Sequence, residues 1–375
     1  MNQDWKSDAL GNVATLQRGF DLPARLRKPG AYPIVTSSGI EQFHAEAKVK
    51  GPGVVTGRYG TIGKVFFVRE DFWPLNTTLY VRDFHENDPQ FVSYLLRTID
   101  FEEHSGKTGV PGVNRNDLHE ITIFMPQTCA EQEGIAGALS DADALIESIE
   151  QLLAKKRQLK QGAMQELLTG NKRLPGSTGE WVAKPLRSIL QVPVTDGPHL
   201  TPRFLDDGIP FLSVNNLANN RIDMNDLRFI SISDHDLFCK KCKPQRGDLL
   251  FGKAASVGKV ALVDTDLEFN IWSPIALIRI NRANSPEFIY YSFQGSGLLT
   301  QIQGLTNSSS QGNIGMSDIE KLVVKVPPFE EQSSIAAILC DMDAQIVTLE
   351  AKLVKARQLK QGMMQELLTG RIRLV

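Results

Sequence analysis

The sequence contains no long hydrophobic run and only four cysteines. No stretch of its 375 residues approaches the roughly 18 consecutive apolar residues that a membrane-spanning helix needs, and MNQDWKSDALGN does not resemble a signal peptide. The cysteines have no regular spacing, which is typical of reduced thiols rather than of a disulfide framework. From these absences we expect a cytoplasmic protein, long enough for two domains with proper cores.

The sequence also lacks an excess of charge of either sign. The formal net charge is −2, and neither half of the chain is strongly basic. A protein that binds DNA mainly by releasing counterions from phosphates would carry such a basic excess. Any contact with nucleic acid must therefore come from local patches or from a partner.

Motifs for nucleotide binding and for methyl transfer are incomplete. A phosphate-binding loop needs Ser or Thr after its Gly-Lys pair, but Val65 follows Gly63-Lys64 and Val260 follows the second such pair. No G-x-G-x-x-G opens a strand–helix–strand unit. An amino-methyltransferase would need a polar acceptor before its Pro-Pro pair, and here Val326 stands before Pro327. The sequence therefore predicts no catalytic constellation.

Two weaker patterns leave alternatives open. Glu46-Ala47-Lys48 with Asp21 upstream is a poor match to a metal-dependent nuclease motif. Cys239 and Cys242 form a C-x-x-C pair, but a structural zinc site would want a second pair of ligands. The alternative is a basic turn able to contact a phosphate backbone, formed by Lys240, Lys241, Lys243 and Arg246.

A long internal repeat dominates what the sequence does contain. Residues 131–170 and 331–370 align without a gap and share 25 of 40 positions, and RQLKQGxMQELLTG differs at a single one. A period of half the chain indicates two copies of a unit made of a domain and a helix. The segments before the two helices are far less alike, so we expect the two halves to recognise different ligands.

Each repeat predicts a long helix with one apolar stripe. Thr128 and Glu131 have capping-box spacing, Pro327 and Pro328 precede the second copy, and each helix ends at a glycine. The stripes recur at spacings of three and four. They are Leu139, Ala142, Ile146, Ile149 and Leu153, ending before Lys156, and Leu339, Met342, Ile346, Leu349, Leu353 and Ala356.

The two stripes most simply pair with each other as an antiparallel coiled coil. About 40 residues of helix span roughly 60 Å, so such a pair would act as a ruler between the domains. The alternative is that each stripe packs on its own domain. Gly162 and Gly362 fall inside the two helical patterns at matching positions, which suggests a close approach or a kink there, or merely tolerated glycines.

The globular segments predict mixed β-structure with short helices. Residues 53–68 and 247–263 are both expected to form a strand, a glycine-rich turn and a strand. Polar loops at 105–115 and 306–316 follow in each half. The glycines would let backbone N–H groups approach phosphate beside Arg58, Lys64, Lys253 and Lys259. A tight hairpin with solvated cations explains the same residues.

These observations predict an α+β chain with a pseudo-two-fold internal repeat. Two mixed α/β domains, at 1–128 and 171–328, alternate with the helical segments 129–170 and 329–375. The two long helices form an antiparallel coiled coil that separates the domains.

The chain resembles the DNA-specificity subunits of type I restriction–modification enzymes over nearly its whole length. The resemblance lies in the duplicated PxxxEQxxIAxxLxxxDxxIxxxE pattern with RQLKQGxMQELLTG, and in the openings at 32–39, 195–199 and 208–213. It implies two target-recognition domains, each reading half of a split DNA target, in a non-catalytic host-defence protein.

The resemblance also implies partners. Two modification subunits with adenine-N6 methyltransferase activity would dock on the helices, and restriction (helicase–nuclease) subunits can join them. S-adenosylmethionine, ATP and Mg²⁺ would belong to these partners, while this chain holds neither cofactor nor metal.

The residues expected to contact double-stranded DNA are polar and lie beside the glycine-rich turns. They are Thr36, Ser37, Arg58, Tyr59, Lys64, Lys107, Thr108 and Asn114 in the first half, and Thr195, His199, Ser213, Asn215, Lys253, Ser256, Lys259, Ser309 and Gln311 in the second. The residues expected to dock modification subunits are Arg157, Lys160, Gln161, Glu166, Arg357, Lys360, Gln361 and Glu366. The same packing needed twice would also explain the near-identity of this stretch.

Two other functions remain as alternatives. The chain could be a stand-alone DNA enzyme with an unrecognised site, which methylation by the purified chain would reveal. It could also be a scaffold that binds partners through its helices without reading DNA. Neighbouring genes for a methyltransferase and a helicase–nuclease would favour the recognition subunit.

Overall fold

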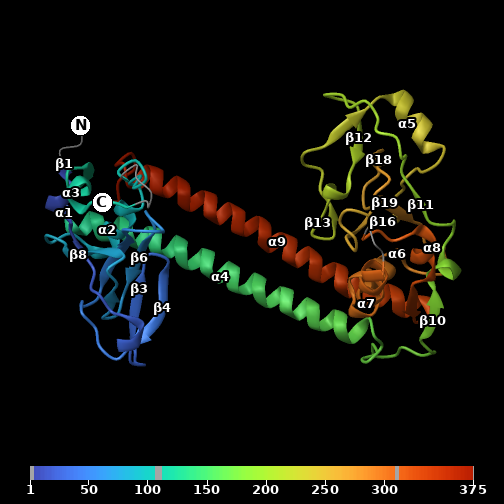
Figure 1. Cartoon of the computed structure of the whole chain (residues 1–375), viewed down its shortest axis with the longest axis horizontal. Helices are drawn as coiled ribbons and strands as arrows, with labels where there is room; N and C mark the ends of the chain where they lie inside the picture. The colour runs from blue at the N-terminus through green and yellow to red at the C-terminus, as the bar shows by residue number, and fades with distance from the viewer. Residues whose placement is uncertain (1–3, 106–111, 309–311, 375) are drawn as a thin grey trace. The chain divides into compact units, whose positions relative to one another are not determined.

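The computed structural model describes residues 4–105, 112–308 and 312–374, and the chain divides into two compact units (Figure 1). Unit 1 consists of Met1–Gln151 and Glu350–Val375, and unit 2 of Leu152–Leu349. Each unit therefore contains one globular domain and parts of both long helices. None of the helices in the described residues is long and apolar enough to cross a membrane.

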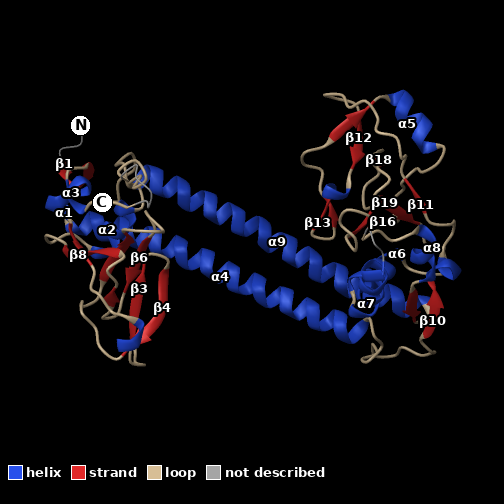
Figure 2. Cartoon of the chain, in the orientation of Figure 1, coloured by secondary structure: helices blue, strands red, loops and turns tan. Residues whose placement is uncertain are grey.

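The two long helices are α4 (Cys129–Leu167) and α9 (Phe329–Leu367), which Figure 2 shows as uninterrupted ribbons. The N–H of Glu131 donates to Thr128 Oγ1 at 3.4 Å, as the capping box predicts. Gly170 and Gly370 have φ angles of +75° and +68°, the left-handed conformation in which glycine terminates helices. The predicted limits of both helices are thus close to those observed.

The helices are antiparallel within each unit. In unit 1, Lys360 Nζ contacts Asp143 at 2.5 Å, and Arg357 contacts Glu150, later in α4. Residues later in α4 therefore contact residues earlier in α9, as in an antiparallel pair. Unit 2 shows the same order, with Lys160 on Asp343 at 2.6 Å and Lys156 on Gln345 at 2.6 Å. The antiparallel pairing predicted from the two stripes is confirmed.

The stripes have both of the roles considered for them. Leu139 and Leu339, near the helix starts, are fully buried in the cores of their own units. Leu153 and Leu353, further along the stripes, are also buried at 6% and 8% exposure. The early part of each stripe therefore packs on its own domain, and the later part belongs to the helix pair.

Each unit contains an ion pair between a buried glutamate and a partly exposed arginine, and the two residues of the pair recur with a spacing of 200 residues. In unit 1, Arg373 donates from Nε and Nη2 to the two carboxylate oxygens of Glu131, at 2.9 and 2.8 Å. In unit 2, Arg173 binds Glu331 in the same two-pronged way, at 2.7 and 2.6 Å. We call each of these Glu–Arg pairs a clasp. The clasp ties the tail of one long helix to the start of the other.

Aromatic rings pack beside the clasps. The ring of Trp5 lies against Gly370, where a Cβ would approach within 3.0 Å, and Trp181 lies against Gly170 at the same distance. Trp5 Nε1 also donates to Glu131 at 3.1 Å. Glycine is therefore needed at the helix ends both for its positive φ and for the close approach of an indole ring.

A second repeated network joins the helices to the domains. Tyr94 Oη donates to Asp143, which also accepts from Lys360, and Tyr291 Oη donates to Asp343, the acceptor of Lys160. Burial is the first cause that raises the pKa of both tyrosines, and the neighbouring aspartates raise it further. The tyrosines therefore remain protonated donors.

Domain 1, the globular part of unit 1, contains two small sheets and a strand pair. Its helices are α1 (Leu10–Val13), α2 (Pro89–Leu96) and α3 (Arg115–His119), with a short 3-10 turn η1 (Ala24–Leu26). Its strands are β1 (Trp5–Ala9), β2 (Thr15–Arg18), β3 (Tyr32–Thr36), β4 (Gly39–His44), β5 (Gly53–Gly57), β6 (Val65–Val68), β7 (Trp73–Pro74), β8 (Thr78–Asp83) and β9 (Thr122–Pro126). The sheets have the orders β2-β8-β5-β6 and β4-β3-β7, and β1 pairs with β9.

Domain 2, the globular part of unit 2, has more elements. Its helices are α5 (Ile232–Cys239), α6 (Pro286–Gln294), α7 (Ser296–Ser308) and α8 (Met316–Lys321), with 3-10 turns η2 (Leu186–Ile189) and η3 (Val214–Asn216). Its strands are β10 (Val182–Pro185), β11 (Thr195–Asp196), β12 (Ile209–Leu212), β13 (Leu217–Ala218), β14 (Arg221–Ile222), β15 (Arg228–Ile230), β16 (Leu249–Gly252), β17 (Val260–Leu262), β18 (Asn270–Ile271), β19 (Ile275–Ile278) and β20 (Val323–Val326).

The two domains share one topology. The order β11-β19-β16-β17 in domain 2 repeats β2-β8-β5-β6, and β15-β12-β18 repeats β4-β3-β7. The pair β10–β20 corresponds to β1–β9. Domain 2 adds the hairpin β13–β14 and the helix α5 between its sheet strands. The predicted strand–turn–strand units are β5–β6 and β16–β17, so the mixed α/β repeat is confirmed.

Candidate nucleic-acid interface

The glycine-rich turn after β5 carries several of the predicted contact residues of domain 1. A Cβ on Gly57 would lie 1.7 Å from the carbonyl oxygen of Thr61, and Gly60 and Gly63 have φ angles of +78° and +77°. Only glycine allows this tight path. The N–H of Arg58, the next residue, donates to the Thr77 carbonyl at 2.9 Å. The glycines of this turn therefore have a conformational cause, whatever the turn binds.

Arg58 and Tyr59 form the centre of this surface. The guanidinium of Arg58 lies over the ring of Tyr59, 4.6 Å from its centroid. The ring of Tyr59 packs on Gly112, where a Cβ would be only 2.3 Å away. The Arg58 carbonyl accepts from Val113 at 3.1 Å. Two segments far apart in sequence thus present a stacked cation and an exposed aromatic ring together, a combination suited to nucleic acid.

The other predicted residues of domain 1 have different environments. Ser37 adjoins Gly57 and Gly60, so it belongs to the same surface, and Lys64 is exposed at the end of the turn. Asn114 is exposed and caps α3, accepting from Asn116 at 3.0 Å. Thr36 is buried, and its hydroxyl bonds within the β3–β4 turn to Gly39. Its assignment as a DNA contact stays a prediction.

The turn after β16 repeats this arrangement in domain 2. The Lys253 N–H donates to the Pro274 carbonyl at 2.9 Å, and its carbonyl accepts from Ile314 at 2.9 Å. Arg58 makes the same two kinds of bond in domain 1. A Cβ on Gly252 would lie 2.5 Å from the Ser256 carbonyl, much as one on Gly57 would approach Thr61. The fold therefore places Arg58 and Lys253 at equivalent positions.

The remaining predicted residues of domain 2 divide into bonded and exposed groups. Ser213 donates from its N–H and its hydroxyl to Asn216 Oδ1, at 2.9 and 3.1 Å, at the start of the 3-10 turn η3. Lys259 reaches the Val214 carbonyl at 3.4 Å beside that turn. Asn215 is exposed between them, whereas Thr195 and Ser256 are half-buried. Lys107, Thr108, Ser309 and Gln311 lie outside the described residues.

A buried carboxylate that the sequence analysis did not single out lies beside Lys253. Asp196 is fully buried at the end of β11, and Lys241 Nζ donates to its Oδ1 at 2.5 Å. Lys253 Nζ and His199 Nε2 each lie 3.2 Å from Oδ2. Burial alone would raise the pKa of Asp196, but the two lysines together hold it below its ordinary value. The carboxylate therefore stays ionised.

The two cysteines of the C-x-x-C pair have different surroundings. Cys242 is buried, and burial raises the pKa of its thiol to about 12. Cys239 lies 3.7 Å from the ring nitrogens of His235, which contacts Asn270 Oδ1 at 2.7 Å. Over the part of the chain that the structure describes, no three His, Cys, Asp or Glu side chains are grouped to hold a metal ion.

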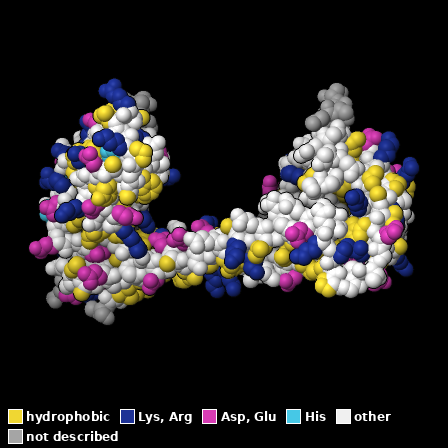
Figure 3. Space-filling model, turned by 90° about the horizontal axis from the view of Figure 1, so that it is seen from below, with side chains coloured by type: hydrophobic (Ala, Val, Ile, Leu, Met, Phe, Trp, Pro, Cys, Tyr) yellow, Lys and Arg dark blue, Asp and Glu magenta, His cyan; other side chains and the backbone are white. Residues whose placement is uncertain are grey.

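Charged side chains are interspersed on the face of each unit shown in Figure 3. Basic and acidic groups alternate with apolar ones there, and neither sign forms a broad patch. This distribution agrees with the net charge of −2.

The predicted docking residues are only partly available to a partner. Lys160 and Lys360 are bonded to aspartates within their own units, with side chains 15% and 18% exposed. Internal packing therefore explains why lysine recurs there. Glu166 lies near Lys172 and Glu366 near Arg371, while Gln161 and Gln361 are exposed. Arg357 contacts Glu150, and Arg157 also has a partner within the chain. Docking through these residues stays a prediction.

Other repeated residues of the same stretch have no such internal explanation. Leu159 and Leu359 are 51% and 59% exposed. One turn further, a Cβ added to Gly162 or Gly362 would meet no atom within 4 Å, so the close approach considered for them does not occur among the described residues. We call Leu159 with Gly162, and Leu359 with Gly362, the docking patches. Leu159, Gly162 and Leu359 are exposed, and Gly362 is half-buried.

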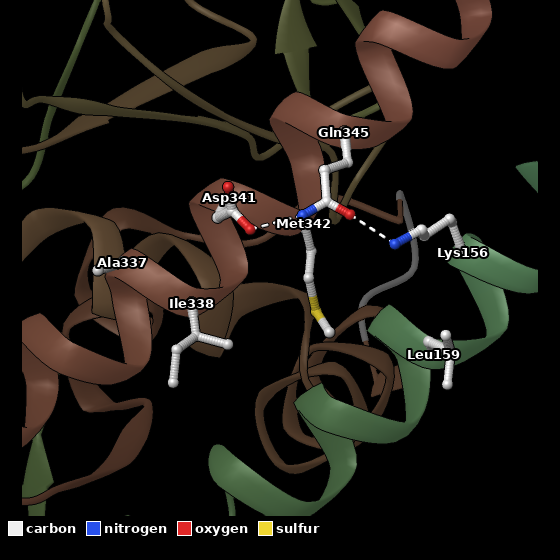
Figure 4. A pocket seen from close by; sticks show the side chains of 7 residues that line it. All are labelled: Lys156, Leu159, Ala337, Ile338, Asp341, Met342 and Gln345. Atoms are coloured by element: carbon white, nitrogen blue, oxygen red, sulfur yellow. Dashed lines mark hydrogen bonds between the residues drawn. The ribbon is translucent and has the colours of Figure 1, made fainter.

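The docking patch of unit 2 borders a cavity of about 400 Å³ between α4 and α9. Figure 4 shows Leu159 from α4 facing Ile338 and Met342 from α9. Lys156 donates to Gln345 at 2.6 Å, and Gln345 donates to Asp341 at 2.6 Å. These three hydrogen-bonded polar residues line the cavity together with the apolar ones.

Comparisons with known proteins point to one family. The family model described as "Type I restriction modification DNA specificity domain" matches residues 2–156 and 179–356. The MjaVIII specificity subunit of Methanocaldococcus jannaschii is 23% identical over 299 residues, which cover 76% of this chain and 69% of that protein. The EcoBI specificity subunit of Escherichia coli is 25% identical over 132 residues, which cover 35% of this chain and 28% of that subunit.

Solved structures share the fold. The S subunit of a type I restriction–modification system from M. genitalium superposes with a TM-score of 0.72 at 16% identity, covering 98% of this chain and 96% of that one. A chain from a study of complex assembly in a type I system gives a TM-score of 0.54 at 16% identity, covering 99% of each. At this identity the likeness concerns the fold alone.

Proposed function

The chain belongs to the type I restriction–modification DNA-specificity family, and we propose on this basis that it is the DNA-recognition subunit of such a complex. It reads a bipartite, asymmetric target, with one half-site for each domain, and performs no catalytic step itself. The observation that carries this proposal is the repeated turn: Arg58 and Lys253 occupy equivalent positions in two domains whose loops otherwise differ. Equivalent frames with different side chains suit two different half-sites.

Partner subunits complete the function. Two copies of a modification subunit dock on the helices and carry the adenine-N6 methyltransferase activity, and restriction subunits can join them. S-adenosylmethionine, ATP and Mg²⁺ belong to those subunits. The docking patches support this arrangement, because one surface repeated in both halves fits two copies of one partner. A scaffold without DNA recognition would need the helices but not the two differing turns.

The methylome of cells that express this chain with its neighbouring methyltransferase tests the proposal directly. We expect adenine methylation in a motif of two unlike short half-sites separated by unread bases. Exchange of domain 1 for that of a relative should change one half-site and leave the other intact. A single continuous motif, or methylation by this chain without the methyltransferase, would contradict the proposed function.

Replacing Lys64 by glutamine should weaken DNA binding equally for all sequences. Lys64 is exposed at the end of the turn that carries Arg58 and Tyr59, and a lysine there is expected to contact phosphate rather than a base edge. The slope of log K against log salt should fall by about 1, the loss of one phosphate contact. Anisotropy titrations at several salt concentrations measure this slope. Lys355→Gln, an exposed lysine on α9, is the control and should leave it unchanged.

A further inference from the structure

Asp196 is an unusual residue for the edge of a DNA-binding surface. A carboxylate near phosphate is repelled, and an exposed carboxylate there would weaken binding. Asp196 is instead fully buried beneath three cationic or titratable side chains, two of which reach solvent. The side chains of Lys241 and His199 are 47% and 71% exposed, and that of Lys253 is 16% exposed. The negative charge is thus covered by groups that face outward.

The three side chains come from separate parts of domain 2. His199 follows β11, Lys241 follows α5, and Lys253 begins the glycine-rich turn after β16. Lys241 also donates to the Gly197 carbonyl at 3.1 Å, which fixes its direction. A free lysine loses considerable rotamer entropy when it binds an anion. A shared buried acceptor removes much of that loss before the anion arrives.

The charge balance of the group favours an anion. Two lysines face one carboxylate, so one positive charge remains even when His199 is neutral. Asp196 Oδ2 is buried and makes no hydrogen bond of good geometry in the described residues, so the carboxylate is not fully satisfied by its neighbours. Lys253 and His199 lie close to Oδ2 but are not locked onto it. The cations therefore surround one buried carboxylate, and Lys241 and His199 reach solvent beside it.

Domain 1 has a different residue at the position equivalent to Asp196. Arg18 ends β2, the strand equivalent to β11, and its side chain is 54% exposed. Domain 1 therefore has a cation at the position where domain 2 has Asp196. In domain 2 the cations beside this position are Lys241, which follows α5, and Lys253, which follows β16. The helix α5 has no counterpart in the described part of domain 1, so Lys241 belongs to the added segment of domain 2.

We infer that Asp196 is a positioning residue for DNA binding, which holds Lys241 and Lys253 as a preformed phosphate-binding pair on domain 2. This inference rests on the proposed function. It assigns Lys241, which lies in the basic turn beside Cys239 and Cys242, to the DNA surface. His199 extends the same pair toward solvent.

The sign of the effect of Asp196→Asn distinguishes positioning from simple charge. Removing a negative charge near phosphate should strengthen binding if only Coulomb interaction matters. If Asp196 positions the lysines, Asp196→Asn should weaken binding about tenfold and lower the salt slope by about 1 to 2. The full chain, with whichever subunits co-purify, is titrated with a labelled mixed-sequence duplex of about 30 base pairs, roughly three helical turns. Equal or tighter binding with an unchanged slope would overturn the inference.

Two further variants separate this role from a loss of stability. Glu331 is a buried carboxylate bound by Arg173 at 2.7 and 2.6 Å in the same unit, so Glu331→Gln weakens a comparable ion pair at the start of α9. It should leave the salt slope unchanged. In a Lys241→Gln, Lys253→Gln background, Asp196→Asn should have no further effect on binding, because it acts through those lysines. Absence of DNA binding by the unaltered protein would instead refute the proposed function.

Discussion

Replacing Glu131 by alanine should destabilise unit 1 by about 2–3 kcal/mol, because it leaves a buried donor unpaired and removes a two-pronged ion pair. Glu131 is 4% exposed and accepts from Arg373 and from the buried indole of Trp5. Hydrogen exchange followed by mass spectrometry measures unit 1 separately. Amides of α2 and β9 should exchange roughly 30- to 150-fold faster, since about 1.4 kcal/mol corresponds to a factor of ten.

The repeat supplies the control for this prediction. Glu331→Ala removes the clasp of unit 2 and should accelerate exchange there while leaving unit 1 unchanged. Its effect should be smaller, because the buried Nε1 of Trp181, unlike that of Trp5, makes no hydrogen bond in the described residues and so loses no acceptor. Equal acceleration in both units by either variant would show that the clasps do not act within single units.

The pH dependence of the clasp follows from the same contacts. The bond from Arg373 is the largest cause that lowers the pKa of Glu131 below its ordinary value of 4.5. A lowered folded-state pKa means that this stability is complete above the unfolded pKa and is lost as pH falls through the folded one. Unit 1 of the native protein should therefore weaken as pH drops below about 4.5, whereas Glu131→Ala should show a flatter dependence there.

The elements that the sequence predicted are those governed by local rules or by the repeat. The stripe through Leu139 and Leu153 required only a period of three and four, and the ends at Gly170 and Gly370 required only their left-handed φ. The strand–turn–strand units were visible because glycine and β-branched residues mark them. Sequence reasoning also gave the antiparallel pairing, since one chain held two matching stripes.

Long-range pairs could not be predicted in the same way. Glu131 and Arg373 are 242 positions apart, and neither pattern nor spacing joins them before the fold is known. The sequence did contain a signal for these pairs. Arginine occupies both position 173 and position 373, just after the aligned repeat, and glutamate occupies both 131 and 331 within it. Lys160 was assigned to partner docking because its stretch is nearly identical in the two repeats, yet its ammonium group is bonded to Asp343 within the helix pair.

The candidate site was predictable in outline but not in its buried part. Arg58, Tyr59 and Ser37 follow from the rule that polar side chains beside glycine turns reach ligands, and the structure brings these three together. Asp196 stands in the 195–199 opening but was not among the predicted contacts, because its role depends on burial that no local pattern shows. Its partners Lys241 and Lys253 lie 45 and 57 positions away along the chain, so only the fold reveals the group.

Replacing both Leu159 and Leu359 by aspartate should abolish assembly with the modification subunit while the chain stays folded. Both leucines are more than half exposed, so a charge there costs little internally. In an interface, a buried unpaired carboxylate would be strongly unfavourable. Native mass spectrometry of the co-expressed complex counts the partner copies. We expect two copies on the unaltered chain, one on either single variant and none on the double variant.

Leu145 provides the matched control, because it separates repetition from exposure. It is 51% exposed on α4, as Leu159 is, but its equivalent in the second repeat is Gln345, so this leucine is not duplicated. If two copies of one partner use the duplicated docking patches, Leu145→Asp should retain both copies. Two copies on the Leu159→Asp, Leu359→Asp variant would place docking elsewhere. Loss of partners from the Leu145 variant alone would mean that unrepeated residues determine assembly, and that near-identity of the helices reflects only the clasps and the Lys–Asp–Tyr networks.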